Sequence, residues 1–201
     1  MMLMRDTIQE RGRTLEDEYF RRQEQELLAK AREQNAHATA RQRLADATGN
    51  HDAVWLDELH VLGYTPDTAV LLPVVPLVEM AWAEGRVSSR EEAVIFALAE
   101  ARGVTPLHPA YEKLERWLME RPPEQFFTRS LRLLVRHFET LPQPERARQT
   151  RQLLDECEQV AQASGSPGFL GNWLNKVCAE ERALLERLRA ELGNFYVAAT
   201  A

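Results

Sequence analysis

The sequence predicts an all-α protein, a helical bundle preceded by a long helical arm at its N-terminus. Two observations support this prediction. Apolar residues recur at spacings of three and four positions along most of the chain, and no stretch alternates between apolar and polar residues for long enough to form a strand. Glycine or proline, the residues that interrupt helices, stands at each break between the periodic stretches.

The first 47 residues form the predicted arm, and Gly49 separates them from the bundle predicted over residues 48–201. The arm helix is expected to open at Thr14 and to continue through highly charged sequence. Two interpretations stand: a solvated arm, or a helix whose apolar residues bind a groove on another protein or on a second copy of this chain. The large apolar residues are too few for a sustained heptad repeat, and they are Leu15, Tyr19, Phe20, Leu27 and Leu28.

Residues 71–101 are the most informative stretch. An apolar helix over residues 74–83 is expected to close at Gly85, because glycine readily takes the left-handed conformation that ends helices. Ser88 and Glu91 have the spacing of a capping box, so a second helix should begin there. The apolar residues of that helix share one face, which predicts a tight αα-hairpin; they are Val94, Ile95, Leu98 and Ala101.

A weaker copy of this pattern follows about ninety residues later. Residues 160–165 resemble residues 78–85, and residues 176–183 resemble residues 86–93, with Cys178 in the place of the capping serine. An insertion over residues 166–175 lengthens the second turn. Its aromatic residues Phe169 and Trp173 are expected either to pack under the bundle or to contact a partner.

This doubled motif resembles the TerB-like family, named for tellurite-resistance proteins, over about residues 71–103 and more weakly over 147–192. The resemblance implies a helical bundle of the kind found in bacterial stress-response and membrane-associated assemblies. For some members it also implies a metal held by acidic residues at the turns. The chain has Glu84 where the family usually has aspartate, and Ser164 at the matching place in the second copy.

The turn at residues 84–91 is therefore the candidate cation site, with Glu84, Ser88 and Glu91 as the ligands. A hard divalent cation needs six to eight oxygen atoms, and this turn offers only part of that set. The alternative interpretation needs no metal and no cofactor: Gly85 ends one helix, and Ser88 with Glu91 caps the next.

The remaining breaks predict further helices over residues 52–62, 109–121, 124–141, 145–163 and 179–192. A helix is also expected to start at Pro66, with Thr65 as its cap and a kink or break near Leu72, because Pro73 and Pro76 each lack a backbone donor. In the last helix we expect an inward face formed by Ala183, Leu184 and Leu188.

Composition and charge narrow the classes of function that this chain could have. The net charge is −6, and residues 48–201 carry all of it, with 16 Lys or Arg and 22 Asp or Glu, which argues against a general affinity for nucleic acid. We see no signal peptide and no membrane-spanning segment, and this leaves peripheral association with a membrane open. Cys157 and Cys178 form no CxxC pair, as expected in a reducing cytoplasm.

The chain carries no motif for nucleophilic, phosphate or zinc chemistry, and its five histidines are scattered. We therefore expect a cytoplasmic, non-enzymatic helical module that binds another protein, or itself, through the arm. The alternative is a stress-response protein that binds a divalent metal at residues 84–91.

Overall fold

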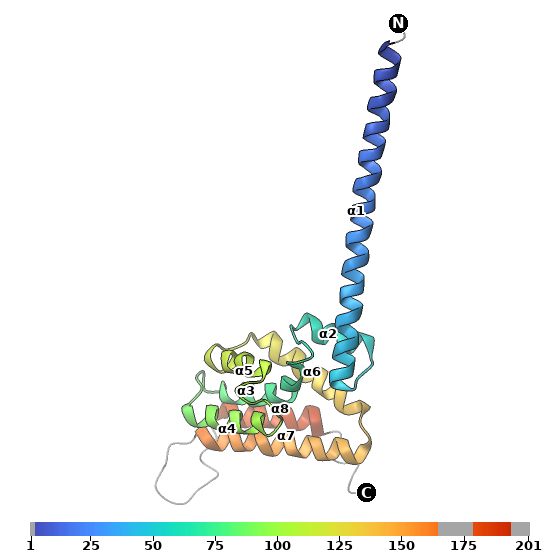
Figure 1. The fold of residues 1–201 in the computed structure, drawn as a ribbon. Coiled ribbons are helices and arrows are strands. Elements are labelled where there is room, and N and C mark those ends of the chain that lie inside the picture. Colours follow the sequence, from blue (N-terminus) through green and yellow to red (C-terminus); the bar gives the residue numbers. More distant parts are fainter. Residues whose placement is uncertain (1–2, 165–178, 194–201) are drawn as a thin grey trace, which may run out of the picture. The chain divides into compact units, whose positions relative to one another are not determined.

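The computed structural model describes residues 3–164 and 179–193, with side chains described for residues 21–163 and 179–192. Every regular element in these ranges is a helix, which confirms the all-α prediction (Figure 1). None of the described helices is both long and apolar enough to cross a membrane. The elements in chain order are α1 (Leu3–Thr48), α2 (Ala53–Val61), the 3₁₀ helix η1 (Ala69–Val74), α3 (Val75–Ala81), α4 (Ser89–Glu100), α5 (Pro109–Met119), α6 (Glu124–Thr140), α7 (Gln143–Ser164) and α8 (Ala179–Gly193).

The chain divides into two compact units after Arg43, close to the boundary expected after residue 47. From here on, the arm is residues 1–43 and the body is residues 44–201. The arm is helical from Leu3 onward and not only from Thr14, since Gly12 costs a helix only about 1 kcal/mol. Helix α1 ends at Thr48, where Gly49 takes a φ of +66°.

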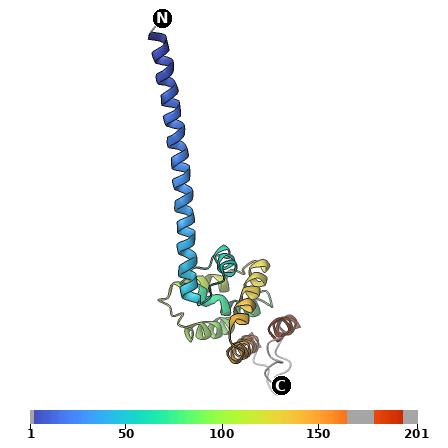
Figure 2. The ribbon, with the colours of Figure 1, turned by 90° about the vertical axis from the view of Figure 1, so that its right-hand side faces the viewer.

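Helix α3 occupies the centre of the body, and each of its seven residues is buried. It packs against η1, α6 and α7, while α4 and α8 lie against α7 (Figures 1 and 2). Helices α3 and α4 touch, as the predicted hairpin requires, but each packs more extensively against α7. The second, weaker turn lies outside the described residues, so the internal repeat stays a prediction.

The expected helix start at Pro66 is wrong. Residues 66–68 form a turn, and η1 begins at Ala69 without a side-chain cap. Thr65 and Thr68 hold this turn, because the Thr65 amide donates to Thr68 Oγ1 at 2.8 Å and the Thr68 amide donates to Thr65 Oγ1 at 3.3 Å. These local bonds compete with helix formation. The break expected near Leu72 is present, as the change from η1 to α3 after Val74.

Tryptophan side chains connect the helices through hydrogen bonds, one of them buried and the other partly buried. The indole of Trp55 on α2 donates to the carbonyl of Leu133 on α6 at 2.8 Å. The indole of Trp82 donates to the carbonyl of Trp117 on α5, also at 2.8 Å. Because each ring fills apolar space and its N–H has a partner, these contacts fix the positions of α2 and α5.

Helix α7 contributes Leu153, Val160 and the fully buried thiol of Cys157 to the core. Helix α8 lies beside it, with the axes of the two helices roughly aligned (Figure 2). The expected inward face of α8 is partly wrong, because Ala183 is exposed and Leu184 only partly buried. The buried residues instead follow spacings of four, three and four, which place them on one helical face: Glu181, Leu185, Leu188 and Leu192.

We predict that Leu153→Ala lowers the free energy of unfolding by about 2–5 kcal/mol, since it opens a cavity where α7 meets the core. Urea unfolding of the full chain measures this loss. Gln159→Ala, at an exposed position of the same helix, is the control and should change stability by less than about 0.5 kcal/mol. Equal effects of the two substitutions would contradict the burial of Leu153.

Candidate functional site

Three places carry candidate function: the arm, the turn at residues 84–91, and a cavity in the body. In the arm, each residue from 21 to 38 is exposed. Leu27 is 63% exposed and Leu28 is 49% exposed, although both are large apolar residues. The side chains of Leu15, Tyr19 and Phe20 lie outside the description, although their backbone belongs to α1.

Phe169 and Trp173, the aromatic residues of the predicted insertion, lie outside the described residues. Their assignment as partner-binding residues stays a prediction.

The turn at residues 84–91 has the predicted local structure. Gly85 takes a φ of +81°, and Ser88 and Glu91 form a complete capping box. The Ser88 amide donates to Glu91 Oε2 at 2.7 Å, and the Glu91 amide donates to Ser88 Oγ at 3.3 Å. The cap therefore uses the Ser88 hydroxyl and one carboxylate oxygen of Glu91, two of the oxygen atoms that the cation hypothesis needs.

Glu84 is exposed, and among the described residues no three His, Cys, Asp or Glu side chains gather in a metal-binding arrangement. The cation hypothesis thus rests on Glu84 and on the second carboxylate oxygen of Glu91, and it stays a prediction.

Burial raises the pKa of Glu91, although the hydrogen bonds with Ser88 act in the opposite direction. The neighbouring carboxylates of Glu181 and Glu84 raise it further. This carboxyl group is only 3% exposed, so the cap holds a charge in an unfavourable environment at neutral pH.

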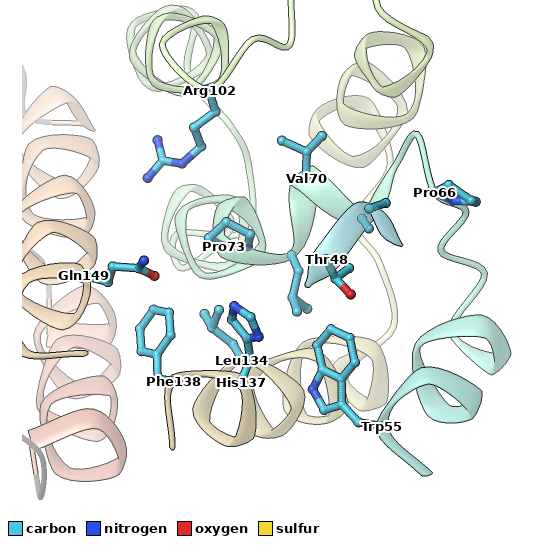
Figure 3. Close-up of a pocket in the computed structure, with 13 residues that line it drawn as sticks. Thr48, Trp55, Pro66, Val70, Pro73, Arg102, Leu134, His137, Phe138 and Gln149 are labelled. Atoms are coloured by element: carbon cyan, nitrogen blue, oxygen red, sulfur yellow. The ribbon is translucent and has the colours of Figure 1, made fainter. Parts of the chain in front are cut away.

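The cavity, which sequence reasoning did not predict, has a volume of about 320 Å³ and lies between the end of α1, α2, η1, α6 and α7. Figure 3 shows Trp55, His137 and Phe138 along one side of it, with Arg102, Val70 and Pro73 opposite. No local motif could have indicated it, because its lining comes from segments up to about a hundred residues apart. The one available signal was the pair of prolines, Pro66 and Pro73, beside a mostly apolar run.

The polar side chains of the cavity are Thr48, Arg102, His137 and Gln149, and the Thr48 hydroxyl donates to the Leu44 carbonyl at 2.7 Å. The Arg102 guanidinium donates to the Leu98 carbonyl at 2.8 Å and forms a short ion pair with Glu156. Nδ1 of His137 is buried and has no hydrogen-bond partner. Burial lowers the pKa of His137, so the ring is neutral at pH 7 and offers one donor and one acceptor.

Comparison of the chain with protein-family models, with curated proteins and with solved structures found no match. The resemblance to TerB-like proteins therefore stays a prediction from residues 71–103 and 147–192.

We predict that the free energy of unfolding of Glu91→Gln, minus that of the natural chain, increases as the pH rises from 4.5 to 7. The folded-state pKa of Glu91 lies above its unfolded value, so the natural chain loses stability as pH rises through the folded pKa. Glutamine stays neutral and still fits a capping box. Urea unfolding of both chains at several pH values measures the difference, and Glu92→Gln at an exposed position of the same turn is the control. A difference that does not vary with pH contradicts the prediction.

The cation hypothesis predicts that millimolar calcium, magnesium or manganese raises the thermal midpoint, because a ligand bound only by the folded state stabilises it. Glu84→Gln should abolish that increase. Thermal melts with and without a chelator measure it, and a midpoint that no cation changes would reject a cation site at this turn.

Proposed function

We propose that this chain is a non-enzymatic, protein-binding helical module whose arm is the contact element. The observation that carries the proposal is the exposure of Leu27 and Leu28 on the arm helix, whose other residues from 21 to 43 are charged, polar or alanine. Water solvates such a helix well except at these leucines. Burying one leucine fully against a partner is worth roughly 1.5–3 kcal/mol, so two adjacent leucines can anchor a specific contact.

The charge of the arm supports a protein partner over a nucleic acid or a lipid surface. Residues 1–43 hold nine Lys or Arg and eight Asp or Glu, so the arm has a net charge of only +1 with which to attract a polyanion. Charges of both signs can instead pair with side chains of a partner helix and select its register.

Another protein is the partner that we propose, with a second copy of the chain as the alternative that the test separates. The resemblance to TerB-like proteins agrees with this function, since it implies work within assemblies. A stress-response role belongs to the same proposal.

The test compares three full-length baits in affinity capture: the natural chain, Leu27→Glu with Leu28→Glu, and Gln23→Glu with Gln25→Glu. The two double variants add the same charge at neighbouring exposed positions of the arm. A protein retained by the natural and glutamine-substituted chains should be lost from the leucine-substituted chain. With the purified partner, the leucine variant should raise Kd by at least about tenfold, equivalent to roughly 1.4 kcal/mol.

Sedimentation velocity of the natural chain alone tests whether the arm binds a second copy of this chain. Concentration-dependent association that disappears in the leucine variant would make the partner another copy of this chain. Equal behaviour of all three chains in both experiments would contradict a role for the arm leucines.

A further inference from the structure

The cavity in the body continues into a second one. The second cavity has a volume of about 190 Å³ and shares Pro73, Arg102, Phe138 and Gln149 with the first. The first alone reaches the lower end of the usual range for ligand pockets, roughly 300–1,000 Å³. Together they form one elongated site, which we call the α6–α7 pocket, and which extends from Trp55 to Leu153.

The walls of the α6–α7 pocket are mostly apolar and fixed in place. Trp55 is anchored by its hydrogen bond to Leu133 and stands beside His137, with ring centroids 5.6 Å apart. Pro73 adds a rigid ring on the opposite side (Figure 3). Such walls favour the binding of an apolar group, since they lose little freedom when they are covered.

The charged residues of this pocket are of one sign. Arg102 and Arg148 are among the lining residues of its two cavities, and no Asp or Glu is. This contrasts with residues 48–201 as a whole, where acidic residues outnumber basic ones by 22 to 16. Arg102 pairs with Glu156, and Arg148 pairs with Glu145 at 2.7 Å, but neither glutamate lines the pocket. Because both charged lining residues are arginines, an anion is the ligand charge that these walls complement.

Arg102 can bind a second acidic group. Its guanidinium carries five N–H donors, and the bonds to Leu98 and Glu156 use two of them. Figure 3 shows the guanidinium on the side of the pocket where Gln149 lies. On the opposite side of the pocket, His137 presents a buried nitrogen with no hydrogen-bond partner, which a polar ligand atom or a water molecule can satisfy.

We propose that the α6–α7 pocket binds a small carboxylic acid with an apolar tail. The carboxylate lies at Arg102 and Arg148, and the tail lies between Trp55, Val70 and Phe138. This site is independent of the arm, so its success or failure leaves the proposed protein-binding function untouched.

The experiment measures binding of three probes with the same eight-carbon tail, octanoate, octanol and octylamine, to the full-length chain by titration calorimetry. Quenching of tryptophan fluorescence adds a second readout, because Trp55 forms part of the wall. Octanoate should bind with a Kd at least about tenfold lower than that of either other probe. No octanoate binding at millimolar concentration, or equal affinity for octanoate and octanol, overturns the proposal.

Substitutions of pocket residues test whether octanoate binds in the α6–α7 pocket. Arg102→Gln combined with Glu156→Gln removes the ion pair without leaving a buried charge alone, and it should weaken octanoate binding at least about tenfold. Arg148→Gln, at a side chain that is 73% exposed, should weaken it severalfold in a chain that folds normally. Val70→Trp should fill the cavity and abolish binding of all three probes.

Arg132→Gln, at an exposed position of α6, is the matched control for the loss of one positive charge and should leave octanoate binding unchanged. Full octanoate affinity in both Val70→Trp and Arg148→Gln would show that the acid binds elsewhere, and would overturn the assignment to this pocket.

Discussion

The body depends on a central helix that has no face toward water. Because α3 is buried on every side, the one charged residue within it, Glu79, must find a partner inside the protein. Arg187 on α8 supplies that partner at 2.5 Å, 108 residues along the chain. Burial still raises the pKa of Glu79, while Arg187 opposes the increase. Helix α8 is thus held in place by the need to neutralise a buried carboxylate as well as by its leucines.

The Arg102–Glu156 pair follows the same principle in the central part of α7. It joins the residues after α4 to α7 across 54 positions of sequence, and Gln152 supports it by donating to the second Glu156 oxygen at 2.9 Å. An ion pair of this kind contributes little net stability, because desolvation of both groups offsets their attraction. It does determine how the helices pair, since a wrong arrangement would leave a charge alone. Arg102 is consequently held rigidly where it lines the α6–α7 pocket.

Local features were predictable from the sequence and distant ones were not. The capping box at Ser88 and Glu91 depends on two residues three positions apart, so their spacing alone revealed it. Glu181 shows the limit: a glutamate on the inward face of α8 contradicts the usual rule that charged residues face water. The cavity could not be predicted at all, because its shape depends on how five segments pack. Leu27 and Leu28 are exposed, and their sequence-based assignment as partner-binding residues stays a prediction.

Because the Cys157 thiol is buried in the core, its chemical reactivity depends on how often the core opens. Burial raises the pKa of this thiol far above its usual value, and neighbouring carboxylates, Glu156 first among them, raise it further. Alkylating reagents attack the thiolate. In the folded body the sulfur is shielded from the reagent, and the raised pKa leaves little thiolate to react. The rate at which such a reagent modifies Cys157 therefore measures how often α7 separates from the core, in the natural sequence and without any added label.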